Sequence, residues 1–387
     1  MKTSLYIQRL IDKMQPQLSD IHTTDESLEF RLSNIPVSIA NALRRTILSD
    51  MERIVLNPQQ IEINTSGHFH NEIMKHRIQS VPFIPIHKGS RMTNEEMVDF
   101  VQEHRVEIDV QNTGAEKSYV TTGDFKIWSK TKQEYLADSD VREKFPPYRN
   151  DYYIDLMRLY PAKGPTIPGE QFKAKIDLAI NTAKNDGCFS VVSKCSYQNT
   201  PDHVAIEKVW AEKERISKEA NVSIEVLEYN KRDFYLLDAE RHYIENSFDF
   251  IVETNGIYEN EDIVRRACGV LIQRFTHLKS LAESDELILR ENPNMDHAYD
   301  VLLEDGDYTM GYLLDYVLYT LYVEGEKKLT FCGFMKEHPH KKQSVLRMAF
   351  EEPQDMILAK SYIMNACEKI VQVFESIELY FGKRTPK

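Results

Sequence analysis

The sequence predicts an α+β protein in which one strand–helix arrangement occurs twice. Near the start, apolar and polar residues alternate over 27–32, and a helical pattern follows. Near the end, residues 299–303 alternate in the same way and a second helical pattern follows. Each half also closes with a long amphipathic helix, over 260–282 and over 354–381. A chain that repeats such a set of elements is expected to pack its halves together, which indicates assembly rather than catalysis.

The first helix is expected over 36–50, where Pro36 suits the first helical turn and Ser33 or Asn34 can serve as its cap. Its apolar residues recur at helical spacing on one face: Ile39, Ala40, Leu43, Ile47, Leu48 and Met51. Three polar residues fall largely off this stripe: Asn41, Arg44 and Arg45. These arginines have two open interpretations, a solvated face or bidentate contacts with a partner's carboxylates or backbone.

In the second half, the helix expected over 309–323 has its own apolar stripe: Met310, Leu313, Leu314, Val317, Leu318 and Leu321. The final helix repeats apolar residues at alternating steps of three and four, which is typical of a packing seam. The sequence therefore predicts that both long helices are buried along one side.

Between the halves, alternating apolar residues predict several short strands, among them 60–64 and 81–86. The polar stretch 138–151 is interpreted as a loop, because Pro146 and Pro147 interrupt it. Residues 204–229 are charged and helical in pattern, which predicts a solvated excursion.

Composition narrows the function classes. The net charge is −13, from 61 acidic and 48 basic residues, whereas proteins that grip nucleic acid through its phosphates carry a basic face. The five cysteines are scattered, which indicates a reducing compartment rather than a disulfide framework. No apolar run is long enough to predict a membrane span.

Candidate metal and catalytic groups are better explained as ordinary loops and turns. His68, His70 and His76 cluster, but nothing nearby completes the four ligands that zinc usually takes. Pairs that could suggest a site are Cys188 with Cys195, Asp138 with Asp140, and His338 with His340. None has the further ligands or partners that such a site requires. We expect no metal, no cofactor and no catalytic residue.

One stretch resembles a known family. Residues 38–45 read SIANALRR, which resembles the signature helix of the α-type subunits of multisubunit RNA polymerases. Residues 61–66, 71–72 and 76–86 then resemble the family's strand, its "NTS" turn, its acidic residue and its "HRL…IPL" run. Residues 120–124 and 187–197 resemble later sequence blocks of the family more weakly. Residues 248–278 resemble the segment in which the family's chain returns to the dimerisation domain.

The second half resembles the small partner subunit of the same family. Residues 304–314 read EDGDYTMGYLL and are similar to that partner's "EDHTLGNLL" block. Residues 331–334 followed by 338–340 are similar to its "V-x-F-x-G-Y…HP" block. The two partners are usually separate chains, such as the third-largest and eleventh subunits of RNA polymerase II or archaeal D and L. Here they look fused, and such fusions imply a large nucleocytoplasmic DNA virus as the source.

The resemblance implies two pseudo-symmetric α-type dimerisation modules, each an antiparallel sheet plus helices, with a mainly β insert domain. The implied divisions follow the chain in this order: an N-terminal extension 1–23, a larger-partner module 24–53 and 196–283, an insert 54–195, a linker 284–295, and a small-partner module 296–387. The family's cysteine-rich zinc loop has no counterpart in the insert, which agrees with the expectation of no metal.

The implied function is that of a non-catalytic scaffold on which the two largest polymerase subunits and small assembly subunits gather. Asn41, Arg44 and Arg45 are then expected to face the second-largest subunit, and Glu72 and Arg77 to support the adjoining insert. The interface between the halves is expected to use Leu43, Ile47, Leu313, Leu314, Val317 and Leu318. The implied location is the host cytoplasm or virion for a viral chain and otherwise the nucleus, with no membrane or nucleic-acid contact. A transcription factor that touches DNA and an unrecognised stand-alone enzyme are the alternatives.

Overall fold

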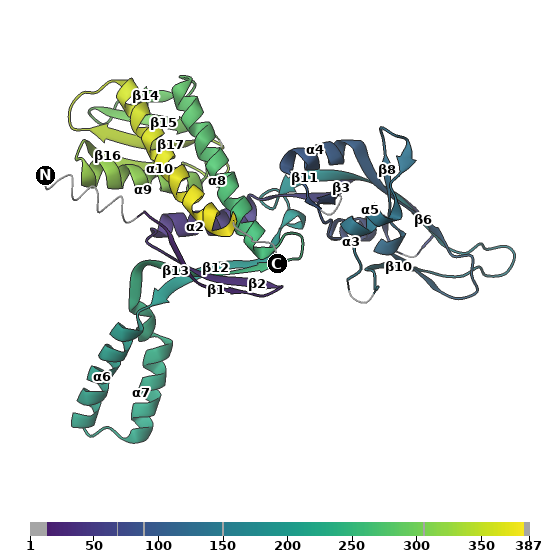
Figure 1. Ribbon diagram of the computed structural model, residues 1–387, viewed down its shortest axis with the longest axis horizontal. Helices are drawn as coiled ribbons and strands as arrows, with labels where there is room; N and C mark the ends of the chain where they lie inside the picture. The colour runs from purple at the N-terminus through teal and green to yellow at the C-terminus, as the bar shows by residue number, and fades with distance from the viewer. Residues whose placement is uncertain (1–13, 68, 88–89, 149–150, 305, 383–387) are drawn as a thin grey trace. The chain divides into compact units, whose positions relative to one another are not determined.

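The structure, a computed structural model, describes residues 14–67, 69–87, 90–148, 151–304 and 306–382 (Figure 1). The described chain forms two compact units. Unit 1 comprises the residues up to Ile47, Lys194–Glu253 and the residues from Asn260 onward, and unit 2 comprises Leu48–Ser193 and Thr254–Glu259. Strands pair antiparallel in every sheet of the described chain, which confirms the predicted α+β class. No helix in the described part of the chain combines the length and the apolar character that a bilayer span requires.

The first half of unit 1 is a four-stranded sheet with two helices. The strand order is β1-β2-β13-β12, with β1 at Gln17–Thr23, β2 at Ser27–Ser33, β12 at Val192–Pro201 and β13 at Tyr243–Thr254. Alternation in β2 buries Leu28, Phe30 and Leu32, as the period of two requires. The helices are α2 (Val37–Ser49) and α8 (Asn260–Glu283), and α8 contacts β2.

The second half of unit 1 is also a four-stranded sheet with helices. The strand order is β14-β15-β17-β16, with β14 at Leu289–Glu291, β15 at Ala298–Leu303, β16 at Leu329–Met335 and β17 at Ser344–Phe350. The helices are α9 (Tyr308–Leu318), which continues as a π-helical segment η4 (Tyr319–Gly325), and α10 (Met356–Gly382). Helix α9 packs against β16, β17 and α10.

A helical hairpin joins β12 to β13. Its arms are α6 (His203–Glu219) and α7 (Ile224–Leu236), followed by a 3₁₀ turn η3 (Asp238–Arg241). Figure 1 shows the two arms side by side, joined by a short turn. The Asp202 carboxylate accepts a hydrogen bond from the Ala205 N–H and caps α6.

Unit 2 is built on a five-stranded sheet of order β3-β11-β6-β8-β9. Its strands are β3 (Glu52–Thr65), β11 (Gln171–Thr182), β6 (His104–Gln111), β8 (Lys126–Ser129) and β9 (Glu134–Tyr135). Two small sheets add β7 (Ser118–Thr121) with β10 (Asp155–Leu159), and β4 (Ile86–His87) with β5 (Ser90–Arg91). Its helices are α3 (Asn71–Gln79), α4 (Asn94–Glu103), α5 (Asp138–Lys144) and the 3₁₀ turns η1 (Thr122–Asp124) and η2 (Gly187–Phe189). One apolar core fills this unit, with Phe83, Phe145 and Phe172 among its largest side chains.

Several elements differ from the sequence prediction. Residues 81–85 are not a strand, because Pro82 and Pro85 lack the N–H groups that a sheet ladder needs. The loop predicted over 138–151 contains α5, which has acidic residues in its first turn and basic residues in its last, as the helix dipole favours.

The expected divisions of the chain also hold more structure than their sequences predicted. Within the extension 1–23, residues 1–13 lie outside the described residues, and the rest includes strand β1. The linker 284–295 contains β14, which pairs with β15. The insert, expected to be mainly β, carries three α-helices beside its sheets. Strands β1 and β14 were missed because they are edge strands with largely exposed side chains and no apolar alternation.

Candidate functional site

The two halves of unit 1 meet along their long helices, α8 and α10, which pack side by side (Figure 1). We call this contact the seam. Both helices bury apolar side chains, among them Ile263, Ala267, Leu271 and Phe275 on α8, and Ile363, Cys367, Ile370, Phe374 and Ile377 on α10. At one end, the Phe381 ring meets Phe30 of β2 edge-on, with ring centroids 5.2 Å apart. Apolar burial of this kind is the main stabilising contribution to such an interface.

The six residues expected at the internal interface are all buried. Leu43, Ile47, Leu313, Leu314 and Leu318 have 0% exposed surface, and Val317 has 1%. The most extensive helix packing between the halves nevertheless lies along α8 and α10, while α9 reaches the seam through α10. The assignment of these six residues to a dimerisation interface remains a prediction.

Two arginines of the first half reach the beginning of α9. The Arg45 Nε donates to the Thr309 Oγ1 at 2.9 Å, and an Arg274 nitrogen lies 3.8 Å from an Asp307 carboxylate oxygen. Asp307 is the N-cap of α9, since its carboxylate accepts from the Met310 N–H at 2.9 Å. The sequence did not predict this internal role for Arg45, because its partner is 264 positions away.

Asn41 and Arg44 form the polar face of α2. The Arg44 Nε and Nη2 both donate to the Asn41 Oδ1, at 3.2 and 2.8 Å, so the amide orients the guanidinium. Both residues are half-buried. Burial raises the pKa of the nearby Cys195 thiol to about 12, against a smaller opposing effect of Arg44. This polar face combines an oriented, permanently charged donor with a neutral thiol, which suits hydrogen bonding to a partner rather than chemistry.

The second half carries an aromatic face on α9 and β16, made of Tyr308, Tyr312 and Phe334. The Phe334 ring lies 6.0 Å from Tyr308 and 5.5 Å from Tyr312, between ring centroids. Phe334 approaches so closely because Gly311 has no side chain: a Cβ there would lie 2.1 Å from a ring carbon. Tyr312 is 53% and Tyr308 37% exposed, and β16 is an edge strand of its sheet. Exposed apolar surface beside a strand edge is typical of a binding surface.

Glu72 and Arg77 both belong to α3 in unit 2. The Arg77 Nη2 donates to the Asp155 carbonyl oxygen at 2.9 Å, and its guanidinium lies 6.0 Å from the centroid of the Phe69 ring. Glu72 is exposed in the first turn of α3. A shallow pocket of about 460 Å³ opens beside Arg77, lined by Ile73, His76, Arg77, Ser80, Ile154, Asp155 and Leu156. A partner-binding role for Glu72 and Arg77 is still a prediction.

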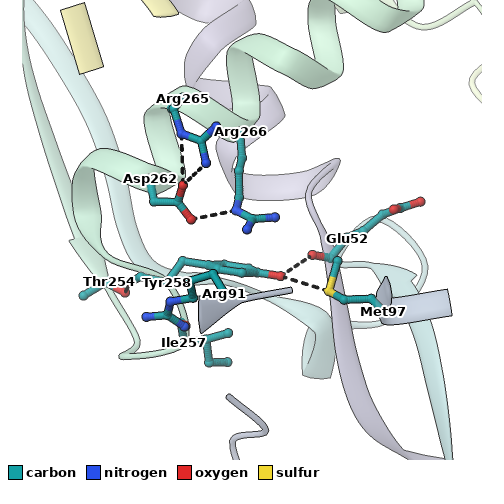
Figure 2. A network of polar contacts seen from close by, with 9 residues as sticks. All are labelled: Glu52, Arg91, Met97, Thr254, Ile257, Tyr258, Asp262, Arg265 and Arg266. Carbon is teal, nitrogen blue, oxygen red and sulfur yellow. Dashed lines mark hydrogen bonds and ion pairs between the residues drawn. The ribbon is translucent and has the colours of Figure 1, made fainter. Parts of the chain in front are cut away.

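A second network in unit 2 surrounds the buried side chain of Tyr258 (Figure 2). The Tyr258 hydroxyl donates to the Glu52 carbonyl oxygen at 3.1 Å and approaches the Met97 sulfur at 3.7 Å. Arg91 lies 5.8 Å from the ring centroid and donates to the Ile257 carbonyl oxygen. The Thr254 hydroxyl donates to the Tyr258 carbonyl oxygen at 2.7 Å. The sequence prediction missed this residue, because a lone tyrosine after the Asn255-Gly256 turn carries no periodic signal.

Figure 2 also shows an ion cluster within α8, where Asp262 contacts Arg265 and Arg266. Burial of Asp262 favours its neutral form, but the two arginines outweigh that effect and its pKa is lowered. The carboxylate lies in the first turn of α8, where the helix dipole also favours negative charge.

The described cysteines are free thiols, and within the described residues no group of three or more His, Cys, Asp or Glu side chains is placed to hold a metal. His68 of the histidine cluster lies outside the described residues. Burial raises the pKa of Cys188 and of Cys367 to about 12, and it also raises those of Cys268 and Cys332. Thiols held neutral in this way are poor nucleophiles and poor metal ligands.

Comparison with known proteins finds a matching family model and several similar chains. Residues 29–275 match the model of the RNA polymerase Rpb3/Rpb11 dimerisation domain. The human DNA-directed RNA polymerases I and III subunit RPAC1 is 23% identical over 297 residues, covering 65% of this chain and 80% of that protein. The DNA-directed RNA polymerase subunit Rpo3 of Pyrococcus horikoshii is 25% identical over 268 residues, covering 65% of this chain and 92% of that protein. The Pyrococcus furiosus Rpo3 is 26% identical over 267 residues, covering 65% of this chain and 90% of that protein.

Proposed function

Since the chain belongs to the RNA polymerase Rpb3/Rpb11 dimerisation family, we propose that it works as a two-module assembly platform for a polymerase. It is an Rpb3-like, non-catalytic subunit of a multisubunit DNA-directed RNA polymerase. The observation that carries the two-module proposal is the seam, where the long helix of each half packs on the other. One polypeptide then replaces two partners and removes a bimolecular step.

The proposed second module is the Rpb11-like partner, fused to the Rpb3-like one. Support comes from strand order: β1-β2-β13-β12 in one half and β14-β15-β17-β16 in the other. In each half, the strand before the first helix is central, and the strand before the long helix pairs with it. Each sheet also carries an Arg–Asp pair between its central strands, Arg31 with Asp249 and Arg347 with Asp300, both with a shortest distance of 2.6 Å.

Matching burial supports the same equivalence. The first seven residues of β12 and the seven of β16 follow one pattern, in which the first and fourth are buried, and Cys195 and Cys332 take the fourth position. Aligning α2 with α9 from their first residues pairs Leu43 with Leu314 and Ile47 with Leu318, all buried. The same alignment pairs Asn41 with Tyr312 and Arg44 with Asp315. A viral source, which the fused arrangement implies by resemblance, remains a prediction.

The two equivalent faces are proposed to bind different subunits. The polar face of α2, with Asn41 and Arg44, suits carboxylates and backbone carbonyls of the second-largest subunit. The aromatic face of α9 and β16 suits an apolar surface of the largest subunit. Arg45 takes part in the first contact only indirectly, by holding α2 to α9. Glu72 and Arg77 beside the unit 2 pocket are proposed to contact a small assembly subunit.

The test is co-purification of the two largest subunits with the tagged chain after co-expression. We expect Arg44→Ala to reduce recovery of the second-largest subunit, and Tyr308→Ser with Tyr312→Ser to reduce recovery of the largest. Val37→Ser, an exposed change at the start of α2, is the control. Undiminished recovery in both variants contradicts the assignment of the faces. RNA synthesis by the purified chain alone contradicts the scaffold function itself.

A further inference from the structure

We infer that the outward face of α7 is a docking site for an amphipathic helix of a partner protein, one that carries lysine or arginine beside its apolar residues. The face consists of Val226, Tyr229, Asp233 and Leu236, which we call the α7 stripe. It lies on the hairpin and uses neither the seam nor the polar and aromatic faces.

The inner face of α7 is already occupied by α6. Ile206, Trp210, Phe234 and Ala239 form a small buried core between the arms. The Trp210 and Phe234 ring centroids are 5.5 Å apart, and the Lys213 ammonium lies 4.6 Å from the Phe234 ring centroid. This core accounts for the stability of the hairpin, so the apolar residues on its outside need a separate explanation.

The α7 stripe exposes large apolar side chains in a regular row. Tyr229 is 70% exposed, Leu236 61% and Val226 48%. Successive members are separated by three, four and three residues, so they lie along one side of the helix, about 120° around its axis from Phe234. A helix that carries large apolar residues on a second side, away from its packed face, is normally covered on that side as well. The spacing is that of a coiled-coil seam, which fits a second helix lying along α7 over about 15 Å.

Charge defines the occupant further. Four acidic residues of the hairpin and the turn after it have basic partners, whereas Glu207 and Glu228 have none among the described residues: Arg215 contacts Glu212 and Glu219, Lys218 contacts Glu214, and Lys213 contacts Asp238. Asp233, in the middle of the stripe, makes no side-chain ion pair or hydrogen bond with any described residue. Glu225, exposed beside the stripe, has no such contact within the described chain either. A docked helix with a lysine or arginine opposite Asp233 would complete the pairing, because a cation near a carboxylate is favoured once water is partly excluded.

The experiment measures binding of two synthetic helical peptides to the full-length chain by fluorescence anisotropy. Both peptides carry leucine at every a and d position; one has lysine and the other glutamate at the flanking e and g positions. We expect the lysine peptide to bind the wild-type chain more tightly than the glutamate peptide. The double variant Tyr229→Ser, Leu236→Ser should weaken its binding at least about tenfold, because exposed aromatic and leucine anchors carry most of such an affinity.

A charge-reversal variant tests the role of Asp233 more directly. Asp233→Lys should reverse the preference, so that the glutamate peptide binds better than the lysine peptide. Val204→Ser, a change at a 79% exposed residue of α6 outside the stripe, should leave both affinities unchanged. The changed side chains are exposed, so far-ultraviolet circular dichroism should match the wild-type spectrum.

Three outcomes overturn the inference. The first is no binding of the lysine peptide to the wild-type chain. The second is binding that the serine and lysine variants leave unchanged, which would indicate attraction to the acidic protein as a whole. The third is self-association of the wild-type chain in sedimentation that the serine variant abolishes, which would assign the stripe to a second copy. None of these outcomes depends on the polymerase subunits, so the scaffold proposal is tested separately.

Discussion

Under the equivalence proposed for the two halves of unit 1, the buried positions match more closely than the exposed ones. Leu43 of α2 and Leu314 of α9 are both fully buried, and the edge strands β12 and β16 follow the same burial pattern. In contrast, the half-buried Asn41 and Arg44 lie on the polar face of α2, whereas the exposed Tyr308 and Tyr312 lie on α9, its proposed equivalent. Close packing restricts the buried positions, while the exposed positions are free to fit different partners. The exposed residues are therefore the ones expected to distinguish the partner of one half from the partner of the other.

The largest effect on stability should come from the buried leucines that occupy aligned positions in α2 and α9. Leu43→Ala and Leu314→Ala should each lower the free energy of unfolding by about 2–5 kcal/mol, since each leaves a cavity in a fully buried site. Chemical denaturation measures both, with the exposed Val37→Ala as the control. If one substitution cost less than about 1 kcal/mol while the other cost several, the two positions would not be equivalent.

Position 311 in α9 should not tolerate the alanine that α2 has at the aligned position. Alanine occupies the aligned position 40 in α2, but at position 311 a Cβ would lie 2.1 Å from the Phe334 ring. Gly311→Ala should therefore cost about 1–3 kcal/mol, despite the better helix propensity of alanine. Thermal unfolding measures the change.

Gly269→Ala in α8 is the matched control for that substitution, because a Cβ there meets nothing within 4 Å. It should stabilise the chain by up to about 1 kcal/mol. A neutral or stabilising Gly311→Ala would show that Phe334 is free to move away.

The adjacent arginines of α2 should separate stability from partner binding. Arg45→Ala removes the hydrogen bond to Thr309 and should cost about 1 kcal/mol of unfolding free energy. Arg44→Ala leaves the contact between the halves intact and should change stability by less than about 0.5 kcal/mol. Denaturation curves of the two variants, beside the co-purification measurements, test this division. Equal losses of stability would place Arg44 in the internal interface as well.

The smallest effect concerns pH in the second sheet. The Arg347 guanidinium, which donates to Asp300, holds the pKa of that carboxyl below its ordinary value, with Asn292 as a further donor. This pair therefore stabilises the fold above the unfolded carboxyl pKa of about 3.9 and loses its contribution as pH falls through the lower folded value.

Asp300→Asn should cost about 1 kcal/mol or less at pH 7. The deficit relative to the wild-type chain should shrink as the pH falls below about 4. Denaturation at pH 7 and at acidic pH measures both values. A deficit that does not change with pH would mean that the pair contributes nothing through its charge.

The sequence predicted those elements whose buried residues recur at a regular spacing. Helices α2, α8, α9 and α10 each carry an apolar stripe, and residues 28, 30 and 32 alternate as a half-buried strand should. Strand β1 left no such signal, because most of its side chains are exposed and only its backbone pairs with β2. Helix α5 was missed because it buries little besides Val141 and Lys144, so its polar sequence is indistinguishable from a loop.

The candidate site was predictable in its residue types but not in its pairings. Asn41 and Arg44 lie three positions apart on one helix, so their contact follows from helix geometry. Arg45 with Thr309 joins residues far apart in the sequence, and only the packed halves determine that contact. The aromatic face was missed for the same reason, since Phe334 meets Tyr312 across two elements.

The most direct measurement is to divide the chain between Asp285 and Glu286, after α8, and to co-express the two fragments. We expect fragments 1–285 and 286–387 to elute together as a one-to-one complex, held by the seam. Ile370→Asp, which places a charge at a fully buried position of α10, should separate them. Fragments that fold and elute independently, with no association at micromolar concentration, would contradict the two-module platform.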